Sequence, residues 1–124
     1  MKNLFTFLLM TILAIGYSHA TTETIDFSKQ GYTNAQTVTT LKGKNCTITF
    51  GDGSNPCAYY NTGNAVRIYG GCSVQITSSL DINKVVYTFS GTSYAPTSSD
   101  CTITPSTGNA TLGTTSLTWT GNTQ

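Results

Sequence analysis

The side chains best suited to chemistry lie in one tyrosine-rich stretch, residues 57–71, which reads CAYYNTGNAVRIYGG. Tyrosine rings offer flat apolar faces that pack against pyranose rings, and amide and guanidinium groups supply hydrogen-bond donors and acceptors. Together these residue types predict a surface that binds carbohydrate. The candidate ligand-binding residues are Tyr59, Tyr60, Asn61, Asn64, Arg67 and Tyr69.

The same stretch also has an architectural interpretation, and the sequence leaves both open. Tyrosines of a β-sandwich often pack their rings inward and hydrogen-bond their hydroxyls to loop backbone. Arg67 would then pair with a carboxylate such as that of Asp26, and residues 61–64 would form only a tight turn. The exposure of the tyrosine rings separates the two interpretations.

Catalytic and metal chemistry find little support in the residues. The only histidine, His19, lies in a segment that we expect to be removed on export, which excludes imidazole catalysis and histidine–zinc sites. Nothing marks any pair of acids as facing each other across a cleft, as a glycosidase requires. Residues 51–55 lack the acid spacing of a calcium loop and predict a polar hairpin turn. We therefore predict no enzyme, no metal and no cofactor.

The first twenty residues have the pattern of a secretory signal peptide. Lys2 gives a positive start, residues 4–16 are largely apolar, and small residues, Ser18 and Ala20, stand where signal peptidase inspects the chain. We expect cleavage after Ala20, with a retained N-terminal anchor as the alternative. The prediction is a secreted, periplasmic or cell-surface protein with a single domain at 21–124 and no membrane span after signal removal. The formal net charge of +1 shows no electrostatic footprint for nucleic acid.

The elements that position the tyrosine-rich stretch are predicted to be β-strands. The chain is rich in threonine and glycine, and charged residues are only 9%, a composition that favours strands over helices. Turns recur about every ten residues. These features predict an all-β fold, an antiparallel β-sandwich, with one possible helical turn at 31–36. The expected strands span 23–27, 37–41, 45–50, 65–69, 72–77, 84–90, 101–104 and 116–119, with Trp119 in the core.

All four cysteines lie in the portion expected to be exported, and their even number favours disulfides. Four cysteines allow three pairings, and the sequence alone does not choose among them. We prefer Cys46–Cys57 with Cys72–Cys101, because Cys57 follows a turn and can fold back toward Cys46. Buried free thiols, which behave as small apolar side chains, are the alternative.

Two segments carry a family resemblance: DFSKQGYTNAQ at 26–36 and AYYNTGNAVRIYGG at 58–71. Over nearly all of residues 21–124, the chain resembles a family of small secreted domains of Bacteroidetes-type bacteria. The resemblance implies a jelly-roll-like sandwich similar to carbohydrate-binding modules, with no established catalytic residue. The four cysteines are not part of the family pattern. Family members also continue beyond the Trp-Thr-Gly segment with further strands, so this chain is expected to be a C-terminally truncated member.

Two functions follow from these observations. The first is a non-catalytic secreted module that binds carbohydrate or another cell-surface ligand, indicated by export, near-neutral charge and the tyrosine-rich stretch. The alternative is a structural or adhesive envelope module that contacts other proteins, for example by strand addition at an open sheet edge. An enzyme is the least supported class. The expected partner is thus a glycan or a surface protein.

Overall fold

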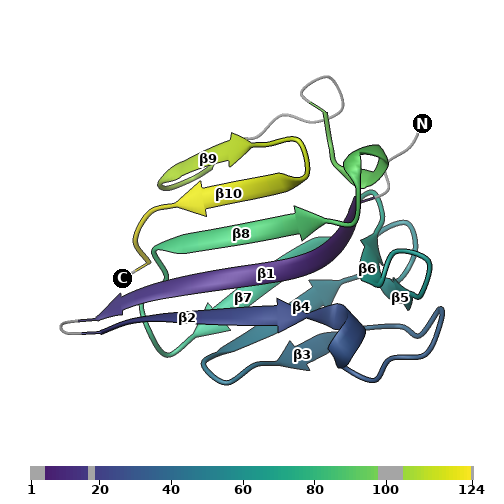
Figure 1. Ribbon diagram of the computed structural model, residues 1–124, viewed down its shortest axis with the longest axis horizontal. Helices are drawn as coiled ribbons and strands as arrows, with labels where there is room; N and C mark the ends of the chain where they lie inside the picture. The colour runs from purple at the N-terminus through teal and green to yellow at the C-terminus, as the bar shows by residue number, and fades with distance from the viewer. Residues whose placement is uncertain (1–4, 17–18, 98–104, 124) are drawn as a thin grey trace.

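The computed structural model describes residues 5–16, 19–97 and 105–123 (Figure 1). The described chain is built from antiparallel strands, and its only helical pieces are two 3₁₀ turns, η1 (Phe27–Lys29) and η2 (Thr92–Tyr94). No helix in these ranges is long and apolar enough to cross a membrane. The predicted all-β, antiparallel class is confirmed. The strand expected at 101–104, with Cys101, lies outside the described residues.

The larger sheet contains seven strands, and β1 (Phe5–Gly16) lies in its middle (Figure 1). Its strands run in the order β5-β6-β1-β8-β10-β9, and β2 also pairs with β1, antiparallel over its whole length. The other bounds are β2 (His19–Asp26), β5 (Ala58–Tyr60), β6 (Ala65–Ile68), β8 (Lys84–Phe89), β9 (Asn109–Leu112) and β10 (Ser116–Thr120). Residues 5–16, the expected signal-peptide apolar run, therefore form a strand of the sheet.

The smaller sheet has three strands in the order β3-β4-β7: β3 (Thr40–Lys42), β4 (Cys46–Gly51) and β7 (Ser73–Ser78). The central strand β4 buries Cys46, Ile48 and Phe50 on one face, as its alternation predicts. Along β7, each exposed polar residue alternates with a partly buried one. This strand ends the described sheet on one side, since it pairs only with β4 there.

Side chains from both sheets meet in one hydrophobic core. It includes Ile25 from β2, Ile48 from β4, Val66 from β6 and Val85 from β8. The rings of Phe27, in η1, and Phe50 meet edge to face, with centroids 6.1 Å apart. This aromatic contact fixes the start of the loop after β2 against the smaller sheet.

Some local predictions differ from the structure. The helical turn expected at 31–36 does not form: Ala35 has a left-handed φ of 64°, and Thr37 makes an isolated bridge to Ala58. The strand expected at 37–41 is shorter and shifted, because residues 35–38 bond to the backbone of 57–59 instead. The strands β5 and β9 were not predicted, since both are short and the sequence around them is rich in turn residues.

Candidate functional site

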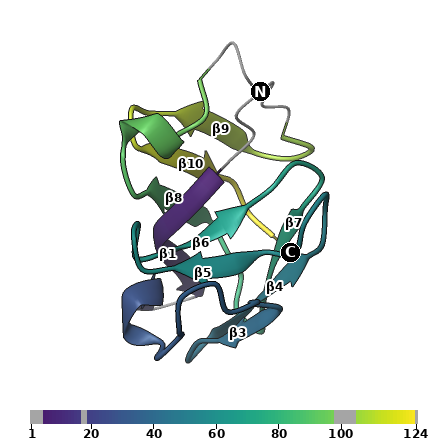
Figure 2. The ribbon, with the colours of Figure 1, turned by 90° about the vertical axis from the view of Figure 1, so that its right-hand side faces the viewer.

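The hairpin of β5 and β6 positions the tyrosine-rich stretch, at the end of the molecule seen in Figure 2. Tyr59 pairs with Val66 and Tyr60 with Ala65. Because successive residues of a strand point to opposite faces, Tyr59 is turned into the core and Tyr60 away from it. Tyr59 is accordingly only 4% exposed, whereas Tyr60 is half-buried.

Tyr60, Arg67 and Tyr69 form one cluster on the face of this hairpin opposite to that of Tyr59. The Arg67 guanidinium carbon lies 4.1 Å from the centre of the Tyr60 ring, a cation–π contact. The hydroxyls of Tyr60 and Tyr69 are 3.3 Å apart. The hydrogen bond between the two hydroxyls, together with burial, raises the pKa of Tyr60. We call these three residues the Tyr60 cluster.

The architectural interpretation suggested an ion pair between Arg67 and Asp26, and this pair does not form. The Asp26 carboxylate accepts hydrogen bonds from the backbone and hydroxyl of Ser28 and lies 3.7 Å from the Lys29 ammonium. These contacts, led by the Ser28 hydroxyl, lower the pKa of Asp26. Arg67 is thus held by an aromatic face, and its planar group belongs to the surface cluster.

Tyr59, Asn61 and Asn64 have structural contacts. The Tyr59 hydroxyl donates to Asn64 Oδ1 at 3.3 Å, and its ring lies 5.7 Å from that of Tyr32. Asn64 adopts a left-handed φ of 49°, as a turn residue can. The exposed Asn61 donates its backbone N–H to Asn34 Oδ1 at 3.1 Å. The contacts of Tyr59 and Asn64 are those that the architectural interpretation expects, and the Tyr60 cluster remains the candidate for the binding interpretation.

A small depression opens beside the Tyr60 cluster. It is lined by Tyr60, Thr62, Gly63, Arg67, Ser90 and Tyr94. Two buried polar atoms of its lining, Arg67 Nε and Ser90 Oγ, have no hydrogen-bond partner among the described residues. The sequence alone does not point to Ser90 and Tyr94, because they lie more than twenty residues after Arg67 and only the fold brings them to it. Neither shows a local pattern that would have singled it out.

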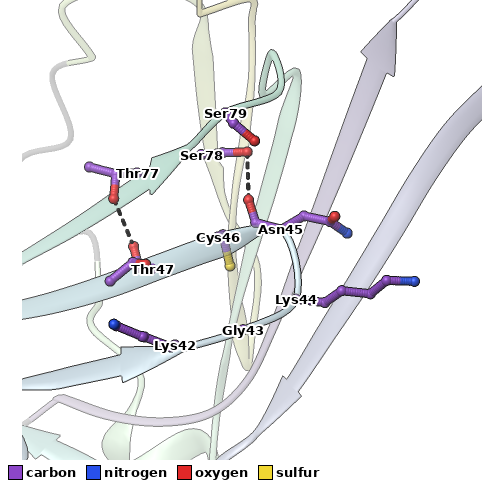
Figure 3. A pocket seen from close by; sticks show the side chains of 9 residues that line it. All are labelled: Lys42, Gly43, Lys44, Asn45, Cys46, Thr47, Thr77, Ser78 and Ser79. Carbon is purple, nitrogen blue, oxygen red and sulfur yellow. Dashed lines mark hydrogen bonds between the residues drawn. The ribbon is translucent and has the colours of Figure 1, made fainter.

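A second depression, of about 310 Å³, lies at the turn between β3 and β4 (Figure 3). The Glu23 carboxylate fastens this turn by accepting the backbone N–H groups of Lys44 and Asn45. Ser78 bonds the turn from β7, donating to the Asn45 carbonyl at 2.9 Å. The side chains of Lys42 and Lys44 extend in different directions (Figure 3), so their charges do not converge on one ligand. These hydrogen bonds hold the turn in place, and we assign them a structural role.

The preferred disulfide between Cys46 and Cys57 is not formed. Cys46, Cys57 and Cys72 carry free thiols in the structure, and Cys101 lies outside the described residues. Burial, followed by the charge and hydrogen bonding of Glu23, raises the pKa of Cys46 to about 11. The Cys57 sulfur lies 3.9 Å from the Gly51 carbonyl oxygen, and burial first, and then the effect of the Cys72 thiol, raise the pKa of Cys57 to about 12. The alternative of buried free thiols fits Cys46 and Cys57.

Across the described ranges, no three His, Cys, Asp or Glu side chains gather where they could hold a metal ion. Comparisons with protein-family models, curated proteins and solved structures gave no match for this chain. The function is therefore argued from the geometry of the Tyr60 cluster and from the sequence.

Proposed function

We propose that the chain is a secreted, non-catalytic binding module, a jelly-roll-like β-sandwich, whose Tyr60 cluster recognises a neutral carbohydrate. One observation carries this proposal: the Arg67 guanidinium lies 4.1 Å from the Tyr60 ring centre, and its buried Nε finds no partner in the described part of the chain. An unpaired buried donor costs about 1–3 kcal/mol. A ligand oxygen that accepted from Arg67 would offset that cost.

The chemistry around this donor suits a sugar. The depression combines the aromatic side chains of Tyr60 and Tyr94 with the hydroxyl of Ser90. Apolar ring faces beside a few fixed polar groups are the usual composition of a small-molecule site. No acidic side chain lines the depression, and the net charge of the whole chain is only +1, which favours a neutral ligand over a charged one.

The resemblance to small secreted jelly-roll-like domains supports the same proposal, since it implies a sandwich similar to carbohydrate-binding modules. The two antiparallel sheets and their shared core are compatible with that architecture. Cell-surface or secreted location, as the signal peptide predicts, would place the cluster where glycans occur.

The test is binding of the purified, exported protein to an array of neutral glycans, followed by calorimetric titration of each glycan that binds. We expect Tyr60→Ala to weaken binding at least tenfold, because it removes both the aromatic face and the support of Arg67. Arg67→Lys should weaken it similarly, because lysine lacks the planar group and Nε.

The matched control is Tyr60→Phe, which keeps the ring face and removes only the hydroxyl that meets Tyr69. It should bind within a few-fold of the unmodified protein. Each variant is checked for folding by its thermal midpoint. Failure of the unmodified protein to bind any neutral glycan would overturn the proposal, as would Tyr60→Ala binding normally.

A further inference from the structure

The strand β1 is paired along both of its edges. On one edge, Leu9–Leu13 pair with Thr88–Lys84 of β8. On the other edge, Phe5–Phe7 pair with β6 and Leu9–Gly16 pair with β2 (Figure 1). We call the place that β1 occupies in the sheet, between β8 on one side and β6 and β2 on the other, the seat of β1. It is one strand wide and has a ladder of backbone hydrogen bonds on each side.

The same residues are the apolar run of the predicted signal peptide. Cleavage after Ala20 would remove β1 and leave β8, β6 and the remainder of β2 each without a partner on that side. The buried residues Ile25, Val66 and Val85, only 4%, 0% and 6% exposed, belong to the three strands that border this seat. Strand edges among such residues are costly to leave unpaired, because each buried backbone N–H or C=O group there would lack a hydrogen bond.

The hydrogen bonds at the two ends of β8 show which of its backbone groups face the seat. The Phe89 N–H donates to Thr115 and the Asn83 carbonyl accepts from Gly121, both on the β10 side of β8. Because neighbouring residues of a strand direct their backbone groups to opposite edges, those of Lys84, Val86 and Thr88 face β1. Val86 pairs with Thr11, so the backbone N–H of Thr11 faces β8.

We propose that, in the exported protein, the seat of β1 accepts one extended apolar segment of a partner protein, added antiparallel to β8. The inference rests on the signal-peptide prediction and not on the Tyr60 cluster. The occupant must be a single strand, because the seat has a ladder on each side; the sheet edge of a second folded copy would be too wide. It must also lack proline where both ladders are engaged, since each position there supplies an N–H to one of them.

The chemistry of β1 itself describes the segment that fits. Residues 5–16, FTFLLMTILAIG, contain no charged residue and no proline. A partner strand of that character would complete the sheet through backbone hydrogen bonds and apolar packing. Such an addition would make the protein part of an envelope assembly, which is the structural alternative drawn from the sequence.

The test begins with the full chain exported from a bacterial host under its own leader. The mass of the product should show an N-terminus at Thr21. A fluorescent peptide of residues 5–16, with lysines at both ends for solubility, should then bind saturably and raise the thermal midpoint of the protein. The same peptide N-methylated at Thr11 should bind at least tenfold more weakly, because it loses the bond to β8.

The matched control peptide is N-methylated at Gly16. On the β2 side Gly16 pairs only with His19, which leaves with the signal peptide, so this peptide should bind like the unmodified one. The Tyr60→Ala variant should also bind the peptide normally, which separates this inference from the proposed carbohydrate function.

A second arm covers the case in which the exported chain does not fold without a strand. A protease site is inserted between residues 17 and 18 of the full chain, which is folded and then cut, so that the β1 segment stays bound without a covalent link. Warmed to near its midpoint, the cut protein should exchange this segment for the labelled peptide and not for the Thr11-methylated one. Retention of residues 1–20 in the exported protein would overturn the proposal. So would a dimer that excludes the peptide, or equal binding of the two methylated peptides.

Discussion

Cys57 and Cys72 lie against the same loop, although fourteen residues separate the two in the sequence. The loop at 51–56 holds both. The Cys57 sulfur is 3.9 Å from the Gly51 carbonyl, and the Cys72 thiol donates to the Asn55 carbonyl at 3.4 Å. The loop is itself bonded to the turn before Cys72, from the Ser54 N–H to the Gly70 carbonyl at 2.9 Å.

Because one loop holds both thiols, and because Cys72 affects the pKa of Cys57, we predict that oxidation links Cys57 to Cys72. Oxidised glutathione would accept the two electrons: the two thiols become one disulfide, and the oxidant becomes two molecules of reduced glutathione. The reaction should be slow at neutral pH, because the raised pKa of Cys57 leaves little thiolate. Peptide mapping by mass spectrometry without reductant should find the Cys57–Cys72 bridge, and the protein should gain about 3 kcal/mol of stability.

The Cys46→Ala variant is the control, because it removes the other described thiol and should leave the bridge intact. Recovery of a Cys46–Cys57 peptide as the main product would contradict the prediction and restore the pairing preferred from sequence.

The raised pKa of Cys46 leads us to predict that the protein loses stability at alkaline pH. The pKa of this thiol is about 11 in the folded protein, above the usual value of 9, because of burial and the Glu23 carboxylate. Unfolded chains lose this thiol proton near pH 9, whereas the folded protein keeps it. The stability that the neutral Cys46 thiol contributes to the folded protein is therefore complete below pH 9 and is lost as the pH rises toward 11. Urea unfolding between pH 8 and 11 should show this decline.

The Cys46→Ala variant should show a shallower decline over the same pH range, since it has no thiol to ionise there. Glu23→Gln should speed labelling of Cys46 by a maleimide and destabilise the protein by about 1.5–3 kcal/mol, through weaker bonds to the turn at Lys44 and Asn45. An alkaline decline identical in Cys46→Ala and the unmodified protein would show that another group is responsible.

The sequence predicts those parts of the fold in which one strand face meets the core and the other meets water. The alternation of Cys46, Ile48 and Phe50 is such a case. It does not predict which of the adjacent Tyr59 and Tyr60 points inward, because β5 is too short to show a period. Its register with β6 decides that question through the pairing of Tyr59 with Val66.

Contacts between distant segments are the part that the sequence could not supply. Ser90 and Tyr94 complete the depression at the Tyr60 cluster from the segment after β8, and no local pattern marks them. The choice of Cys72 as the neighbour of Cys57 depends in the same way on how one loop packs against another. Such partners follow from tertiary structure, and spacing alone leaves several of them equally open.

The Tyr60 cluster predicts a delayed phenol titration. The pKa of Tyr60 is raised above the usual value of a phenol because its hydroxyl hydrogen-bonds with that of Tyr69 and because the side chain is partly buried. A phenol whose pKa is raised on folding contributes stability below about pH 10, which is lost at higher pH. The partly buried Tyr32 and Tyr87 also have raised pKa values, so the phenol absorbance should show several tyrosines that titrate late, of which only the Tyr60 component shifts to lower pH in Tyr69→Phe. Tyr94→Phe, which leaves the pair intact, should change the curve only by the loss of its own phenol.

At the turn that leads into β9, we predict that position 108 accepts only glycine, because there is no space for a Cβ atom. The φ of Gly108 is +70°, and a Cβ there would lie 2.3 Å from the Thr120 carbonyl oxygen and 2.9 Å from Trp119 Nε1. That indole nitrogen donates to the Thr107 carbonyl at 2.7 Å, so the turn and the ring are fixed together. Gly108→Ala should therefore cost about 1–3 kcal/mol or more and shift the fluorescence of Trp119, both measured in one urea titration.

The matched control is Gly31→Ala. Gly31 has a similar φ of +76°, but a Cβ there would meet nothing within 4 Å. Both variants bear the conformational cost of a left-handed alanine, about 1 kcal/mol, and only Gly108→Ala adds a clash with backbone. The difference between the two therefore isolates the steric term. Equal destabilisation of both, with Trp119 fluorescence unchanged, would mean that β9 and β10 are not held together at this turn.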